Sequence, residues 1–293
     1  MTFQEFIQQG WADHDSKTAE VADRLEQNLE LVTDSDSAVG FMNLAIHAVG
    51  DHLGDRARSA SLCEAAFERA GDEPGPAAPL FLTVARRLAG DEEGANAAQA
   101  MLGDDAAVPV RVGLLVAQGL MHAGDWDAAA ALYTSQINTS AALPEGHSGE
   151  RASAIVSNNI AGELIRMKER SEAQDALMEL AAQNARTYWL RVGNWVNDER
   201  ADFTLASVYQ LLGRPQDAKT HAERALATIA ANDEEDKEKV DQAFLHLARG
   251  AACRDLGEAE EHAASIARAE KLAEGFEADW LVGWYREELA KAR

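Results

Sequence analysis

The chain has 293 residues, of which 46% are hydrophobic and 26% charged, so it can bury a sizeable core and is expected to fold. Its formal charge of −23, from 50 acidic and 27 basic residues, repels phosphate backbones and anionic lipids. This charge argues against nucleic acid or a membrane surface as a partner. Alanine and leucine are abundant and aromatic residues make up only 6%, which predicts an all-α fold with minimal sheet.

The first residues, M-T-F-Q-E-F-I-Q-Q-G-W, show no basic region followed by an apolar run. No later window approaches the ~18 uninterrupted apolar residues of a membrane span. We therefore expect a soluble cytoplasmic protein. The two cysteines, Cys63 and Cys253, lie far apart within helical patterns, which is typical of reduced core thiols.

Residues 1–38 are predicted to form capping helices ahead of the main array. Val21, Leu25 and Leu29 have helical spacing behind Ser16, which is a suitable N-cap residue. Such helices would cover the open end of the first repeat.

Residues 201–226 show the helical hairpin from which most of the chain is predicted to be built. Small or apolar residues recur at helical spacing on both sides of a G-R-P turn: Leu205, Ala206 and Tyr209 before it, and Ala218, Ala222 and Ala225 after it. Gly213 is typical of a helix C-terminus, and Pro215 of the first turn of the next helix. The pattern indicates two antiparallel helices in close contact.

The same pattern recurs six times along the chain. Its turn positions are Gly54, Gly90, Gly124, Lys168, Gly213 and Gly257. They are 36 and 34 residues apart over the first three turns, and then 44, 45 and 44 apart. A period of about 34 residues is that of a helix-turn-helix repeat. The later units are predicted to carry longer helices or longer loops, the loops at 142–150 and 231–238.

These units resemble tetratricopeptide repeats, and the resemblance covers roughly residues 39–273 in about six hairpins. The later units, with segments such as S-N-N-I-A-G-E-L, are similar to the long-period variety of kinesin light chains and bacterial regulatory arrays. The resemblance implies a right-handed α-solenoid whose first helices line a concave groove for an extended or helical peptide. The chain departs from the family pattern by lacking a tryptophan near each repeat start and by having His262 where alanine is usual.

Residues 274–293 are predicted to form a C-terminal capping helix. Trp280 and Trp284 lie on adjacent turns of this helix and are expected to be buried as capping core. Upstream, the aromatic link of Tyr188, Trp189 and Trp195 has the residue types of interface anchors. Packing between hairpins is nevertheless predicted for at least two of these three.

No catalytic signature is present: H-E-x-x-H, G-x-S-x-G, a Walker-type loop and C-x-x-C are all missing from the sequence. We therefore expect no enzyme activity and no cofactor. The charge run at 232–239 is predicted to be a solvated loop and helix start.

No metal site is predicted either. His47 and His52 form the closest helical pair, but a five-residue offset places the two rings about 140° apart around an α-helix. The run W-A-D-H-D at 11–15 mixes metal ligands but adjoins a helix cap, where aspartate and serine are common. T-D-S-D-S at 33–37 lacks the glycine and the glutamate that complete a calcium loop.

First-helix side chains are expected to line the groove: Arg111, Gln118, His122, Asn158, Asn159, Arg166, Arg200, Phe203, Ser207 and Gln210. In family members that bind peptide C-termini, an asparagine contacts the terminal carboxylate, and Asn159 stands at the matching position. Leu114 and Gln118 replace the lysine and asparagine of the preceding unit, and Thr204 replaces a second cation. The resemblance therefore implies a general groove contact rather than a carboxylate clamp.

The predicted function is a non-enzymatic scaffold or adaptor that binds a protein or peptide partner in its concave groove. An alternative is a regulatory sensor in which a small ligand or signalling peptide changes the shape of the superhelix. A third hypothesis is an enzyme whose site is assembled from scattered acids and histidines, and no motif supports it. The sequence indicates neither the partner's identity nor the oligomeric state.

Overall fold

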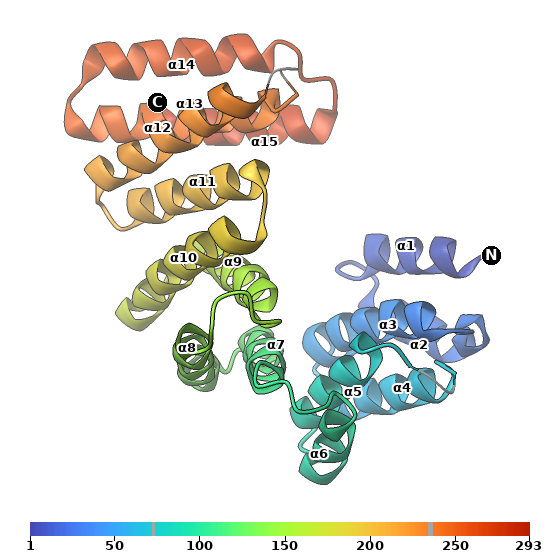
Figure 1. Cartoon of the computed structure of the whole chain (residues 1–293). Coiled ribbons are helices and arrows are strands. Elements are labelled where there is room, and N and C mark those ends of the chain that lie inside the picture. The colour runs from blue at the N-terminus through green and yellow to red at the C-terminus, as the bar shows by residue number, and fades with distance from the viewer. Residues whose placement is uncertain (72–73, 234–236) are drawn as a thin grey trace. The chain divides into compact units, whose positions relative to one another are not determined.

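The computed structural model describes residues 1–71, 74–233 and 237–293 (Figure 1). These residues form fifteen α-helices, one 3₁₀-helix and one π-helix, with no strand among them, which confirms the predicted all-α fold. None of these described helices combines the length and the apolar character needed to cross a bilayer. The chain divides into two compact units, Met1–Ala152 and Ser153–Arg293, and each is described by itself.

The first unit contains two N-terminal helices followed by three helix pairs. Its elements are α1 (Phe3–Asp13), α2 (Thr18–Gln27), the 3₁₀-helix η1 (Leu29–Leu31), α3 (Ser35–Leu44), the π-helix η2 (Ala45–His52), α4 (Arg56–Glu68), α5 (Ala77–Leu88), α6 (Glu92–Ala100), α7 (Val108–His122) and α8 (Trp126–Ala142). Within each pair the two helices pack together, as α5 does on α6 and α7 on α8, and α5 also packs on α7 (Figure 1). Leu25, Phe41 and Leu44 are fully buried at the centre of the core that joins α2, α3 and η2.

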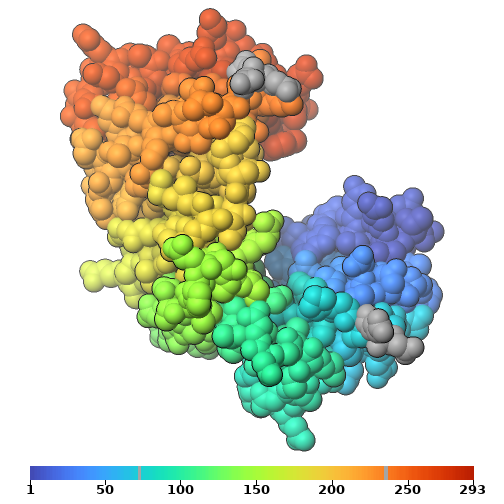
Figure 2. Space-filling model, viewed as in Figure 1, coloured from blue at the N-terminus to red at the C-terminus, as the bar shows by residue number. Residues whose placement is uncertain are grey.

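The second unit begins within the first turn of α9 and runs to the C-terminus. Its helices are α9 (Glu150–Arg166), α10 (Glu172–Val192), α11 (Trp195–Leu211), α12 (Pro215–Asn232), α13 (Lys239–Leu256), α14 (Ala259–Ala273) and α15 (Asp279–Ala292). α11 packs on α12 and α13 packs on α14, while α15 lies against α13. In the space-filling view helices α11 to α15, coloured yellow to red, form a continuous packed block (Figure 2).

Each predicted turn position lies between two consecutive helices of the described chain. The five turn glycines have positive φ, for example +79° at Gly124, a conformation that glycine adopts without steric cost. In the first unit an aspartate follows each turn glycine. Asp55, Asp91 and Asp125 each accept a hydrogen bond from the backbone N–H three residues on. The Gly-Asp pair therefore ends one helix and caps the next.

The turn at Lys168 lacks a glycine and ends its helix by another means. Arg170 Nη1 donates hydrogen bonds to the backbone oxygens of Leu164 at 3.1 Å and Met167 at 2.6 Å. Arg170 Nε donates to Asp175 at 2.7 Å, which holds the guanidinium in place. A cation that satisfies the last carbonyls of α9 thus replaces the left-handed glycine that closes the other turns.

The longer period of the later hairpins comes mainly from longer helices. α5 and α6 have 12 and 9 residues, whereas α9 and α10 have 17 and 21. A loop at 143–149 adds to this at one of the two predicted positions. The other predicted loop, at 231–238, and the charge run at 232–239 both contain residues 234–236, which lie outside the described residues.

The segment Ala45–His52 corrects the prediction made for His47 and His52. It is π-helical, so its hydrogen bonds join residues i and i+5 and a five-residue offset brings two side chains onto one face. Ser59 supports this geometry from α4, since its hydroxyl donates to the backbone oxygen of Ala45 at 3.1 Å. Gly50 leaves room for the serine, because a Cβ there would lie 3.2 Å from Ser59 Oγ. The expected separation of about 140°, which assumes an α-helix, is therefore wrong.

Two predictions about the terminal helices are also wrong. The N-cap of α2 is Lys17 rather than Ser16, and it makes no side-chain capping hydrogen bond. Trp280 and Trp284 are 71% and 44% exposed, so the helix does not bury them as capping core. α15 buries the opposite face, which carries Leu281.

The cysteines and the aromatic link agree with the predictions made for them. Cys63 and Cys253 are buried free thiols. Tyr188 is buried, while Trp189 and Trp195 are half-buried. These aromatic side chains therefore contribute to packing rather than standing out from the surface.

Candidate binding groove

The second unit contains a groove along the row formed by its first helices. The cavity has a volume of about 690 Å³, and every residue that lines it belongs to α9, α11, α13 or α15. α11 packs beside α13, and α13 beside α15, so equivalent positions of successive hairpins form one surface. The groove thus extends the predicted first-helix face onto α15.

Aromatic side chains provide the apolar part of this groove. The ring centroids of Phe244 and Trp284 lie 4.2 Å apart, and Phe203 lines the same cavity. Phe244 is buried and supports the indole of Trp284, which stays 44% exposed. An exposed indole backed by a buried ring is a rigid apolar contact surface. The predicted capping tryptophan therefore lies in the groove wall.

Gln210 brings an unused hydrogen-bond acceptor to the groove. Its Nε2 donates to Asp255 Oδ2 at 2.5 Å. Its Oε1 is buried and accepts no hydrogen bond from the described residues. Ser207, one turn earlier on α11, donates its hydroxyl to the backbone oxygen of Phe203 at 3.1 Å. A ligand N–H group could therefore pair with Gln210 after a small rotation of the amide.

The charged side chains that line the groove are Arg166, Arg254, Lys291 and Glu288. Arg166 pairs with an acid on its own helix, and Lys291 Nζ donates to Glu288 at 2.6 Å. Arg254 Nη1 donates to the backbone oxygen of Lys291 at 2.7 Å, which joins α13 to α15. Exposed pairs of this kind contribute little free energy, so a ligand carboxylate can replace the internal partner at small cost.

The structure brings part of the predicted site together. Arg166, Phe203, Ser207 and Gln210 all line the groove. Asn158 and Asn159 lie on α9 and are half-buried, but neither lines the cavity, and Arg200 lies outside it as well. These three side chains therefore lie outside the cavity that Phe203 lines, and their contact with a peptide stays a prediction.

Arg200, near the start of α11, is held by three carboxylates. Its Nε lies 2.9 Å from Asp241 Oδ2 and 3.4 Å from Glu199 Oε1, and its Nη2 lies 3.4 Å from Glu238 Oε2. Glu199 is fully buried, and its two oxygens accept no hydrogen bond from the described residues. Burial and the nearby Asp241 carboxylate raise the pKa of Glu199 well above its usual range.

The remaining predicted residues, Arg111, Gln118 and His122, belong to α7 in the first unit. All three are half-buried. His122 Nδ1 lies 2.8 Å from Asp51 Oδ2, so it takes part in a different cluster, within the first unit. The ten predicted residues are thus divided between the two units.

A second buried carboxylate joins three helices of the second unit. Asp202 on α11 is 0% exposed and accepts hydrogen bonds from Arg186 Nε, His221 Nδ1 and Arg224 Nε, each at 2.8 Å. Burial alone would raise the pKa of Asp202, but the hydrogen bonds from His221, Arg224 and Arg186 bring it below its usual value. The aspartate is therefore an ionised tie between α10, α11 and α12.

Sequence reasoning did not find the groove residues on α13 and α15. Phe244, Leu247 and Arg254 recur at helical spacing on α13, and Trp284 and Lys291 do so on α15. The same spacing rule that selected Phe203, Ser207 and Gln210 would have found them.

Comparison with known proteins supports the fold alone. No family model matches the chain, and no curated protein matches it. Among solved structures, the crystal structure of BtubC (BKLC) from P. vanneervenii is similar in fold, with a TM-score of 0.51 and 17% sequence identity. The alignment covers 95% of this chain and 95% of that chain. The chain therefore shares an all-helical, repeat-like architecture over nearly its whole length.

Proposed function

We propose that the protein is a scaffold or adaptor of tetratricopeptide-repeat type, without catalysis of its own, whose second unit binds a peptide segment of a partner. The observation that carries this proposal is the composition of the groove. Its lining residues come from the first helices α9, α11 and α13 and from the terminal helix α15, and it combines the exposed Trp284 with an unused acceptor on Gln210. Aromatic anchors with nearby hydrogen-bonding groups are typical of peptide-binding surfaces.

The chemistry of the groove favours one kind of peptide. Phe203, Phe244 and Trp284 provide the contact for a large apolar side chain. Three cations and one acid line the groove, in a chain in which 50 acidic residues outnumber 27 basic ones. We therefore propose a segment with one large apolar anchor and a carboxylate close to it. The local cations oppose the long-range repulsion that a chain of charge −23 exerts on such a segment.

Selection of random peptides displayed on phage tests this proposal directly. The bait is the full chain, and the selected peptides are then measured by fluorescence anisotropy. Trp284→Ser removes the exposed anchor of the groove and is expected to weaken binding by about 10-fold or more, as for an interface hot spot. Trp280→Ser is the matched control, because Trp280 is 71% exposed on the same helix and does not line the groove.

The proposal predicts enriched peptides with an aromatic or leucine anchor and an adjacent acid, with affinity lost in the Trp284 variant only. Equal binding to both variants would place the binding site elsewhere. If no peptide were enriched, the proposal that the groove binds a peptide would be contradicted.

A regulatory sensor is the second proposal, and the size of the cavity favours it. A volume of about 690 Å³ lies within the range of small-ligand sites, roughly 300–1,000 Å³. Native mass spectrometry of the purified full chain distinguishes the two. A bound small molecule of defined mass, lost in Trp284→Ser but kept in Trp280→Ser, would support the sensor.

A further inference from the structure

Four histidines of the first unit gather around the π-helix. His47 and His52 belong to η2, His14 lies in the link between α1 and α2, and His122 ends α7. The ring centroids of His14 and His47 lie 4.9 Å apart, those of His47 and His52 4.5 Å, and those of His47 and His122 5.5 Å. Residues from three separate segments therefore bring imidazoles into contact.

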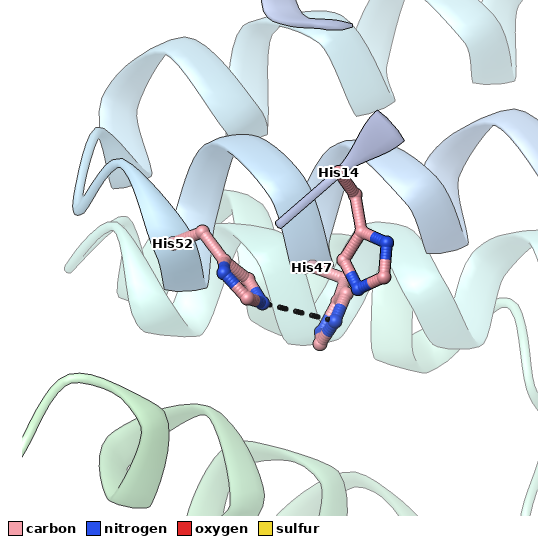
Figure 3. Close-up of side chains that lie close together, drawn as sticks. All are labelled: His14, His47 and His52. Carbon is pink, nitrogen blue, oxygen red and sulfur yellow. Dashed lines mark hydrogen bonds between the residues drawn. The ribbon is translucent and has the colours of Figure 1, made fainter. Parts of the chain in front are cut away.

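The π-helix is what brings His47 and His52 together. Their Nε2 atoms lie 3.1 Å apart (Figure 3). In a tetrahedral zinc site with Zn–N bonds of about 2.0–2.1 Å, two ligand nitrogens lie about 3.3 Å apart. The two imidazoles thus already have nearly the spacing that a shared metal ion requires.

The third imidazole approaches the same point. In Figure 3 the ring of His14 is turned toward His47. One ligand atom from each of His14, His47 and His52 lies within 4.8 Å of the others. Trp11 packs on the cluster, with its ring centroid 5.4 Å from that of His14 and 5.3 Å from that of His47. The apolar indole thus covers part of the cluster.

Each of the three rings has an oxygen next to its other nitrogen. His14 Nδ1 lies 2.5 Å from the backbone oxygen of Trp11. His47 Nδ1 lies 3.6 Å from Asp51 Oδ2, and His52 Nδ1 lies 3.6 Å from Asp15 Oδ1. The 2.5 Å contact lets His14 donate from Nδ1–H to the backbone oxygen, which leaves its Nε2 with a free lone pair, as in the histidine ligands of metal sites. The 3.6 Å contacts of His47 and His52 are too long for hydrogen bonds, so there the carboxylates lie beside the rings as nearby negative charge.

Asp51 and His122 provide a second layer behind His47. Asp51 is only 6% exposed as a side chain, and its Oδ2 lies 2.8 Å from His122 Nδ1. Its Oδ1 is buried and accepts no hydrogen bond from the described residues. A buried carboxylate oxygen without a donor is costly unless a positive charge lies nearby. A cation bound by the adjacent imidazoles would supply that charge.

We propose that His14, His47 and His52 bind one divalent transition-metal ion, of which Zn²⁺ is the type, through their Nε2 atoms. Asp51 and His122 orient His47 from behind and partly balance the charge of the ion. Three imidazole ligands leave the fourth tetrahedral position for water or for a group of a partner. His14, His47 and His52 have side chains 20%, 25% and 31% exposed, so the ion can enter from solvent.

Equilibrium dialysis against Zn²⁺, with the metal measured by plasma mass spectrometry, tests the proposal on the full chain after removal of any purification tag. We expect one tightly bound ion per chain. Co²⁺ in place of Zn²⁺ should give the strong visible absorption of a tetrahedral site. His47→Ala and His52→Ala should each abolish this stoichiometric binding, because each removes a ligand.

Asp51→Asn keeps the three ligands and changes only the outer layer. We expect it to weaken Zn²⁺ binding by about 10- to 100-fold. His147→Ala is the matched control: His147 lies in the same unit but outside the cluster, near Ser140 at 3.3 Å. It should bind Zn²⁺ as the wild type does. Circular dichroism checks that each variant is folded.

Two results would overturn the proposal. One is a wild-type chain that retains no Zn²⁺ in dialysis and gives no tetrahedral Co²⁺ spectrum, which would make the cluster a set of hydrogen-bonded rings. The other is unchanged stoichiometric binding in a folded His14→Ala/His47→Ala/His52→Ala variant, which would place the ion elsewhere. Neither result depends on peptide binding by the second unit.

Discussion

Both units are built from the same kind of helix pair, but they place their polar groups differently. In the first unit the turns are Gly-Asp pairs, helices α1 to α6 have 9 to 13 residues, and the polar cluster of His14, His47 and His52 is partly open to solvent. In the second unit the helices are longer, and the carboxylates of Glu199 and Asp202 are fully buried between helices. The difference shows that one repeat pattern can carry a surface cluster or a buried ionic tie without a change in helix order.

Removing the buried tie of the second unit is expected to have the largest effect. Asp202→Ala leaves Arg186, His221 and Arg224 without their shared carboxylate, and breaking a buried ion pair costs about 3–5 kcal/mol. Urea unfolding measures the loss. Asp217→Ala is the control, because Asp217 makes an exposed pair with Arg214 and should cost less than about 1 kcal/mol. If Asp202→Ala also lost less than about 1 kcal/mol, the tie would not be stabilising.

The same tie gives the second unit a defined pH response. The folded-state pKa of Asp202 is lowered, so its contribution to stability is present above the ordinary value of 3.8 and is lost as the pH falls through the folded-state pKa. Asp202→Ala should therefore lose the corresponding acid-dependent part of the unfolding free energy.

Disturbing the π-helix of the first unit is the next largest test. Ser59→Ala removes the hydroxyl that donates to the buried backbone oxygen of Ala45 and should cost about 1–3 kcal/mol. Ser61→Ala is the matched control, since Ser61 is exposed on the same helix and donates only to the backbone oxygen of Ala57. Thermal unfolding compares the two variants. Equal melting temperatures would mean that η2 keeps its geometry without Ser59.

The smallest effect is expected from Glu199→Gln, and its sign is opposite. The folded-state pKa of Glu199 is raised above its ordinary value of 4.5 by burial and by the nearby Asp241 and Glu238 carboxylates. Arg200 lowers this pKa, but its attraction is the smaller effect. Between the unfolded and folded pKa values the folded chain holds a proton that the unfolded chain has lost, so stability falls as the pH rises. Glutamine removes this penalty.

We expect Glu199→Gln to be more stable than the wild type at pH 8 by about 1 kcal/mol, the equivalent of less than one pKa unit. The gain should shrink toward pH 5, where the wild-type glutamate is protonated when folded. Urea unfolding at both pH values measures it. A gain independent of pH would show that the carboxyl does not titrate between them.

Much of the fold could be predicted from the sequence because its turns are local events. Gly54, Gly90 and Gly124 each precede an aspartate, and a left-handed glycine with a capping carboxylate ends one helix and starts another whatever packs around them. Even the Lys168 position was located correctly by the spacing of its neighbours. Arg170, which replaces the glycine there, acts through contacts that the pattern does not show.

The candidate sites were less predictable because they depend on which surfaces stay uncovered. Phe203, Ser207 and Gln210 follow a periodic pattern, and all three line the cavity of the second unit; their contact with a peptide stays a prediction. Trp284 was expected in a core because the last helix was predicted to cover the exposed end of the array, but α15 buries its Leu281 face instead. Arg200 was expected in the groove, but the carboxylates of α13 and of the loop before it hold it.

By itself the sequence determined the helical class, the six helix pairs, their turn positions and the change of period, since all of these follow from spacing along the chain. Only the tertiary structure decided how the side chains are grouped. The π-helix depends on Ser59 and Gly50 meeting across two elements, and it places His47 and His52 on one face. On an α-helix the same two residues would lie about 140° apart, because its hydrogen bonds join residues i and i+4. The π-helix joins residues i and i+5 and therefore brings them onto one face.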